Sequence, residues 1–196
     1  MANRNKTLRP TDFSPHPDQE AAIAALLETK SGYQINPRGR VWHVSCGYEF
    51  SDKHVSLLSR FPQFTSLVKV SPFRPYANLT DEGVRQLSTI PLMTALKLEN
   101  CSSITNNIFP FLSLNKRIRW LHLNCPNISD EGMECASKMT HLLMFGLIGS
   151  AVTEKSVSHL SKLINLRALF LENCDFSADA IQSLQLALPK CKIATS

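Results

Sequence analysis

A short motif recurs along this chain with a nearly constant period: an apolar residue followed by Ser or Thr. Successive copies are 29, 25, 24, 24 and 24 residues apart. They are Phe50-Ser51, Leu79-Thr80, Ile104-Thr105, Ile128-Ser129, Val152-Thr153 and Phe176-Ser177. A unit of this size cannot bury an apolar face alone, so the period predicts a chain of stacked, similar units.

Each unit combines two kinds of apolar spacing. Before the motif, apolar residues alternate with others over 93–98, 118–123, 142–147 and 166–171, which predicts a strand with one buried face. After the motif, apolar residues follow helical spacing, as Val84 and Leu87 do after Thr80. The Ser or Thr then takes the N-cap position, and acids such as Asp81 and Asp130 lie in the first turn, where the helix dipole favours them. Each unit is predicted to be strand, turn and short helix.

These residues carry a family resemblance. LKLENC with ITNN at 96–107, LFLENC with FSAD at 169–179, and ISDEGM at 128–133 resemble the cysteine-containing class of leucine-rich repeat, over about residues 41–193. Cys125 departs from the pattern by one position. The resemblance implies an α/β leucine-rich repeat solenoid of about six repeats, with a curved parallel β-sheet inside and short helices outside. It also implies a surface offered to a partner.

The chain divides into three parts by composition and pattern. Residues 1–17 hold three prolines and little apolar content, so we expect a flexible N-terminal tail. Residues 18–44 are expected to form an N-terminal cap, because DQEAAIAALLETK at 18–30 is rich in helix formers and 33–44 has the pattern of a β-hairpin. Residues 41–196 are expected to hold the leucine-rich repeats and a short C-terminal cap.

Charge and hydropathy exclude some classes of function. The net charge of +5 suggests a nucleic-acid partner, but Lys and Arg alternate with acids along the chain and the densest group is only Lys116, Arg117 and Arg119. We therefore expect no nucleic-acid binding. No apolar run approaches the roughly 20 residues of a membrane helix, and residues 1–20 hold no apolar signal core, so neither membrane insertion nor secretion is expected.

The six cysteines contain no CxxC pair, so a zinc site lacks its usual spacing. We expect six free thiols, mostly in the core, with Cys191 the most exposed. Free thiols predict a reducing, cytoplasmic location, while the basic residues Arg4, Lys6 and Arg9 leave organelle targeting open.

Nothing in the pattern favours catalysis. His43 and His122 are placed in one outward column of strand positions, three repeats or roughly 14 Å apart, too far to share a metal. The spacing places no Ser or Cys nucleophile beside a His–carboxylate pair, and no glycine-rich phosphate loop occurs. We expect neither an enzyme nor a metal or cofactor.

Outward strand positions supply the main candidate site. In register, Trp120 should adjoin Met144, and Gly146 should leave open space between His122 and Phe170. Leu143 and Ile148 extend this apolar patch, and the charged rim consists of Lys97, Glu99, Arg119, Arg167 and Glu172. A solvent-facing Trp, Met and Phe cluster is typical of a protein-binding surface. An error of one residue in register would instead bury these side chains in the core.

A second candidate lies in the longest spacing between motifs. Residues 71–78 form a proline-rich insertion that carries Phe73, Arg74 and Tyr76. This segment could extend the binding surface, or it could fold onto its own repeat.

The sequence thus predicts a non-catalytic protein–protein interaction module that uses the concave face of the solenoid. Three alternatives stay open: a homodimer or larger scaffold built through the same patch, a basic scaffold for a nucleic acid or other anionic polymer, and an enzyme whose site is built from loops.

Overall fold

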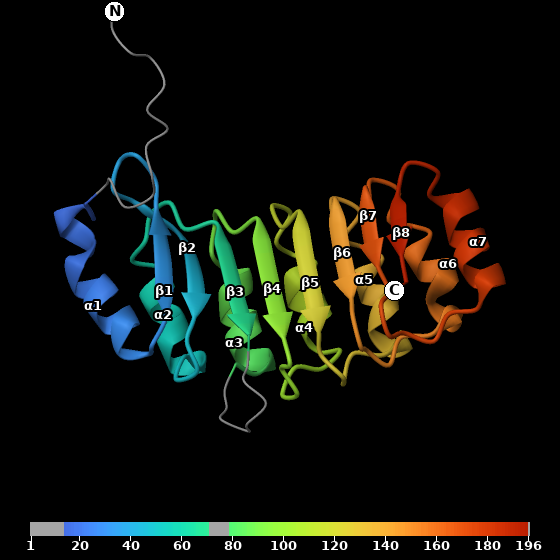
Figure 1. Cartoon of the computed structure of the whole chain (residues 1–196), viewed down its shortest axis with the longest axis horizontal. Helices are drawn as coiled ribbons and strands as arrows, with labels where there is room; N and C mark the ends of the chain where they lie inside the picture. The colour runs from blue at the N-terminus through green and yellow to red at the C-terminus, as the bar shows by residue number, and fades with distance from the viewer. Residues whose placement is uncertain (1–13, 71–78, 196) are drawn as a thin grey trace, which may run out of the picture.

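The computed structural model describes residues 14–70 and 79–195, which form one sheet backed by a row of helices. The eight strands follow one another in chain order across the sheet. They are β1 (Gly32–Ile35), β2 (Val41–Cys46), β3 (Ser66–Val70), β4 (Ala95–Glu99), β5 (Trp120–Asn124), β6 (Met144–Leu147), β7 (Ala168–Phe170) and β8 (Lys192–Ala194). β1 runs antiparallel to β2, and every later pair is parallel (Figure 1).

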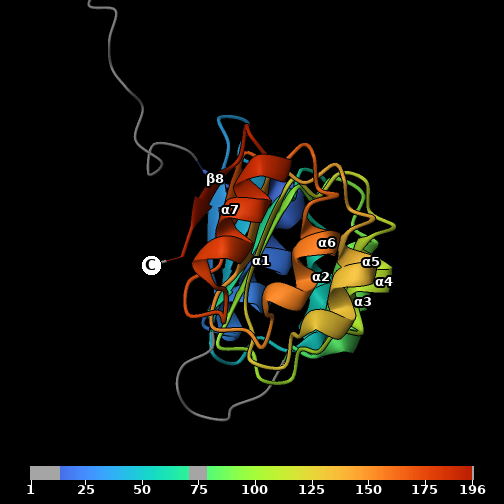
Figure 2. The same cartoon turned by 90° about the vertical axis from the view of Figure 1, so that its right-hand side faces the viewer.

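The helices cover one face of the sheet, as the end-on view of Figure 2 shows. They are α1 (Glu20–Glu28), α2 (Val55–Leu58), α3 (Asp81–Ser88), α4 (Ile108–Leu112), α5 (Met133–Ala136), α6 (Val157–Leu160) and α7 (Ala178–Ala187). One strand and one helix per unit, stacked in order, give the predicted α/β leucine-rich repeat solenoid, with an open sheet. We call the sheet face without described helices the concave face.

The core lies between the sheet and the helices because the repeated leucines point there. Two fully or nearly fully buried columns cross the sheet, one of Leu96, Leu121, Phe145 and Leu169 and the other of Leu98, Leu123, Leu147 and Leu171. Two positions after this second column, Asn100, Gly149 and Asn173 take the left-handed conformation with φ of 55–58°. In the unit of β5 the residue two positions after the second column is Cys125. The cysteines of other units, Cys101 and Cys174, follow their leucine by three residues, yet Cys125 is still fully buried.

A ladder of side chains ties neighbouring repeats together at the helix N-termini. Asp81 accepts the backbone N–H of Thr105 at 2.7 Å, and Asp130 accepts that of Thr153 at 2.9 Å; each also accepts the Thr hydroxyl. The same position in other units links Asp52 to Thr80, Asn106 to Ser129 and Glu154 to Ser177. These groups act between repeats, beyond the helix-dipole role predicted for them.

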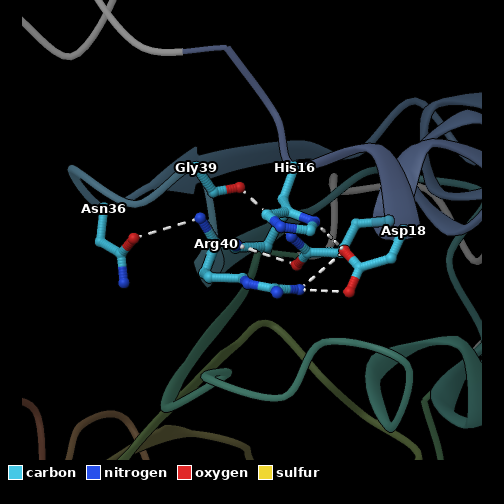
Figure 3. A network of polar contacts seen from close by, with 7 residues as sticks. His16, Asp18, Asn36, Gly39 and Arg40 are labelled. Carbon is cyan, nitrogen blue, oxygen red and sulfur yellow. Dashed lines mark hydrogen bonds and ion pairs between the residues drawn. The ribbon is translucent and has the colours of Figure 1, made fainter.

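The expected helix and hairpin precede the parallel strands, and a polar network joins them (Figure 3). The Arg40 guanidinium binds the carboxylate of Asp18, which also contacts His16 Nδ1 at 2.7 Å. The backbone N–H of His16 donates to Gly39 O at 3.0 Å. Gly39 has φ +70°, and a Cβ there would lie 2.5 Å from Ser14 O, so this turn requires glycine. Residues 14–16 are therefore held against the hairpin.

The cysteines are free thiols, and four of them, Cys46, Cys101, Cys125 and Cys191, are buried. The expectation that Cys191 is exposed is wrong: its side chain closes the core before β8 and is only 3% exposed. Among the described residues, no helix is both long enough and apolar enough to span a bilayer.

Candidate functional site

The concave face presents two columns of outward strand residues. The first column aligns His43, Ser66, Ala95, Trp120, Met144, Ala168 and Lys192, and the second aligns Lys97, His122, Gly146, Phe170 and Ala194. Trp120 therefore adjoins Met144, in the register predicted from the repeat. The columns face away from the core because the strand residues between them, Leu96, Leu121, Phe145 and Leu169, are buried.

A groove of about 800 Å³ runs across the strands on this face, from β1 to β6. Trp42 lies on β2 and Trp120 on β5, and the lining between them consists of the small residues Thr65, Ser66, Thr94 and Ala95. Three strand spacings, or roughly 14 Å, separate β2 from β5. The groove is thus an open trough with an aromatic ring toward each end.

Trp120 is the most exposed large apolar side chain that lines this groove, at 55%. Its neighbour Arg119 is held in place because the guanidinium Nη1 donates to Lys116 O at 3.0 Å and to His141 O at 3.2 Å. Leu143 is 37% exposed and lines the groove together with Met144. An exposed indole among half-buried apolar groups on a hydrogen-bonded sheet offers a rigid apolar anchor point.

At the other end of the groove, His43 is fixed by two hydroxyl groups. Its Nδ1 lies 3.0 Å from Ser66 Oγ and its Nε2 lies 3.1 Å from Ser45 Oγ. Burial lowers the pKa of His43. His43 lies in the column of Trp120 and not in that of His122, so the expectation that the two histidines share a column is wrong.

Lys97, Glu99 and His122 form a charged cluster beside the groove. Lys97 Nζ is 2.6 Å from Glu99 Oε1, and His122 Nε2 is 3.5 Å from the same oxygen. Burial and the nearby Lys97 lower the pKa of His122 against the opposing effect of Glu99. The neutral imidazole is therefore favoured, with Lys97 as the cationic partner of Glu99.

Gly146 does not leave the open space expected between His122 and Phe170. A Cβ on Gly146 would lie 2.9 Å from His122 Nδ1, so the imidazole occupies the room that the missing side chain provides. The absence of a side chain at position 146 thus permits the position of His122.

The remaining predicted site residues are spread around the groove. Phe170 and Ile148 are half-buried and lie beyond its lining, and Arg167 is exposed at the start of β7. Phe73, Arg74 and Tyr76 lie outside the described residues. The proposal that the insertion takes part in binding therefore stays a prediction.

Sequence reasoning missed Trp42, His43 and Ser66 as groove residues. The signal was present, because Val41-x-x-Val44-x-Cys46 has the same spacing as Leu-x-x-Leu-x-Leu with smaller apolar residues. Reading it as a full repeat would have placed His43 in the first outward column. No group of three or more His, Cys, Asp or Glu suited to a metal ion occurs within 14–70 and 79–195.

No protein-family model matches the sequence, and no curated protein matches it. Among solved structures, the chain is similar to a leucine-rich repeat protein of Leptospira interrogans, with 20% identity and a TM-score of 0.48 over 75% of this chain and 34% of that one. It is also similar to an internalin (InlF) of Listeria monocytogenes, with 17% identity and a TM-score of 0.43 over 71% and 50%. The chain spans about a third and a half of these two structures. Its fold assignment rests on its own strand register and buried leucines.

Proposed function

We propose that this leucine-rich repeat solenoid is a non-catalytic module that binds a protein partner in the groove of its concave face. The observation that carries the proposal is the exposed indole of Trp120 beside a groove of about 800 Å³. Tryptophan is enriched among the residues that dominate binding energy, and exposed apolar surface of this kind marks interaction sites.

The backbone of the groove supports recognition without rearrangement. Its strands are fixed by continuous parallel pairing from β2 to β8, so a partner meets a preformed surface and little ordering entropy opposes binding. Trp120 pairs in register with Met144, which is flexible and apolar, and it follows Arg119, which is already hydrogen-bonded to the backbone.

The test compares affinity captures from native lysate with three baits: the wild type, Trp42→Ala with Trp120→Ala, and a matched control. The control is Leu114→Ala with Leu186→Ala, which removes two apolar side chains, each 77% exposed, that do not line the groove. A captured protein is then titrated against each purified bait. We expect the loss of both indoles to weaken binding by about 2 kcal/mol or more, with the control unchanged.

Two results would contradict this function. Equal affinity of all three baits, with equal melting temperatures, would remove the groove from the working surface. Light scattering that shows a wild-type dimer and a monomer for the Trp variant would instead assign the same surface to self-association.

We further propose a reducing compartment, the cytoplasm, on the strength of six free cysteines, four of them buried. Thiol titration of protein denatured without reductant should then find all six.

A further inference from the structure

The fold sorts charges that alternate along the sequence onto two opposite edges. The turns that lead into the parallel strands β3–β8, taken together with Lys192 as the first residue of β8, span 59–65, 89–94, 113–119, 137–143, 161–167 and 188–192. Together they hold nine Lys or Arg and no Asp or Glu. The segments between the other ends of the strands and the next α-helices hold seven of the sixteen acids, among them Asp52, Asp130, Glu154 and Glu172. We call the first of these two edges the basic edge; it lies at the top of the sheet in Figure 1.

The cations of the basic edge are not neutralised within the described chain. The ion pairs of the described residues all involve Asp18, Glu82 or Glu99, and none of them includes a cation of the basic edge. Lys116 and Arg119 donate instead to backbone carbonyls. Their positive charge also acts on a neighbouring histidine. The pKa of His141 is lowered mainly by burial and further by the charges of Lys116 and Arg119.

Helix dipoles do not account for this edge. The dipole acts within the last helical turn, and α5 and α6 have only four residues each. Arg119 and Arg167 stand directly before their strands, seven residues after α4 and α6 end at Leu112 and Leu160. Their position beside the groove points to an external anion.

Three cations of the basic edge border the concave face. Backbone hydrogen bonds run from Leu143 N to Arg119 O, from Arg167 N to Leu143 O and from Lys192 N to Arg167 O, so these residues stand side by side at the starts of successive strands. Arg119 and Arg167 are therefore two strand spacings apart, or about 10 Å. A peptide in the polyproline II conformation rises about 3.1 Å per residue with three residues per turn, so its side chains at positions i and i+3 lie on the same side about 9 Å apart.

We infer that the groove receives an acidic segment of a protein partner, in the polyproline II conformation across the strands, with two carboxylates three residues apart on Arg119 and Arg167 and a bulky apolar side chain against Trp120 and Met144. This inference rests on the proposed function. The apolar side chain of the partner packs in the groove, and the partner's carboxylates bind the unpaired cations beside the groove.

The same face argues against a nucleic acid as the occupant. Protein–DNA contacts that are strong at physiological salt typically neutralise six to ten phosphates, and only three cations of the edge border this face. Glu99 and Glu172 stand at the opposite ends of the strands, where they would repel a polyanion that spreads over the sheet. A peptide with acids on one side only avoids them.

The experiment selects binders from a displayed library of random twelve-residue peptides. The baits are the wild type, Arg119→Glu with Arg167→Glu, Trp120→Ala, and a control with the same change in net charge, Lys53→Glu with Lys155→Glu at the opposite edge. Arg167→Glu alone serves as a second variant, because Arg119 also has backbone contacts. Circular dichroism melting checks that each bait is folded.

Wild type and control should enrich peptides with Asp or Glu at positions i and i+3 near a bulky apolar residue. A synthetic peptide of that sequence should bind the Arg variant at least about tenfold more weakly than the control.

Enriched peptides that need Trp120 but carry no acidic pair would overturn the acidic-segment inference and leave the groove function standing. Selection that is indifferent to both Trp120 and the two arginines would overturn both. Tighter binding of a twelve-nucleotide oligothymidylate than of the selected peptide, with loss in the Arg variant, would assign the edge to nucleic acid.

Discussion

At the scale of single residues, the close approach of Gly146 to His122 sets the shape of the concave face. A Cβ at position 146 would lie 2.9 Å from His122 Nδ1 and 3.3 Å from its Cγ. We expect Gly146→Ala to destabilise the protein by about 1–2 kcal/mol, because the imidazole must leave its position beside Glu99. Urea unfolding measures the effect.

The control for this prediction is the same substitution in a His122→Ala background. Without the ring, Ala in a strand is favoured over Gly by about 0.5–1 kcal/mol, so the effect of Gly146→Ala should change sign. A destabilisation of equal size in both backgrounds would show that the close contact with His122 is not its cause.

The histidines of the groove predict a pH dependence of stability. Burial lowers the pKa of His43, and burial with Lys97 lowers that of His122. The unfolded chain, with a histidine pKa near about 6.5, therefore binds more protons than the folded one as pH falls below that value. The contribution of the two neutral histidines to the free energy of unfolding should be fully present above about pH 6.5 and lost as pH falls toward their folded pKa values.

Urea unfolding between about pH 5 and 8 tests this, with His43→Gln and His122→Gln combined. The double variant should show a shallower loss of stability on acidification, because the glutamines do not titrate. An identical pH profile for wild type and variant would contradict it.

At the scale of the elements, each repeat is joined to the next by one side chain of the ladder. Asp130 accepts hydrogen bonds from Thr153 N, Thr153 Oγ1 and Ser156 Oγ. Partial burial raises the pKa of Asp130, but the hydrogen bonds from Ser156 and Thr153, together with Lys155, outweigh it and lower the pKa overall. The carboxylate thus stabilises the fold above its unfolded pKa, and the effect is lost as pH falls through the folded value.

We expect Asp130→Ala to cost about 2–3 kcal/mol of unfolding free energy, because it leaves the Thr153 N–H without its partner. Asp130→Asn should cost clearly less, because Asn106 already makes the equivalent link in its own unit. Its Oδ1 accepts a hydrogen bond from the Ser129 N–H, and its Nδ2 donates one to Ser129 Oγ. Equal losses for Ala and Asn, measured by urea unfolding at neutral pH, would show that this ladder does not hold the repeats together.

The elements also show what the sequence could and could not predict. Spacing alone gave the strands, the helices and the neighbourhood of Trp120 and Met144, because period-two burial fixes which face each residue takes. It misplaced His43, since the first repeat uses Val and Cys where later ones use Leu. The ladder from Asp130 to Thr153 escaped detection because its partner lies in the next unit, and hydrogen bonds between units leave no periodic apolar signal.

At the scale of the molecule, stacking converts sequence order into spatial order. Charges that alternate along the chain separate by edge because every unit turns in the same way. The same geometry limits each unit to contacts with its neighbours, as the chain order of the strands shows. Stability should therefore be distributed along the solenoid, with its ends opening more readily than its centre.

Two leucines with equal burial test this distribution. Leu123 on central β5 and Leu184 on terminal α7 are both 0% exposed, so each change to Ala should cost about 3 kcal/mol locally. We expect Leu184→Ala to raise amide hydrogen exchange in α7, β7 and β8 and to leave β4 protected. Leu123→Ala should raise exchange in β4, β5 and β6, because both flanks pack on it. If Leu184→Ala instead raises exchange equally in all strands, the solenoid unfolds as one cooperative unit, and loss of packing at one end would be transmitted to the groove.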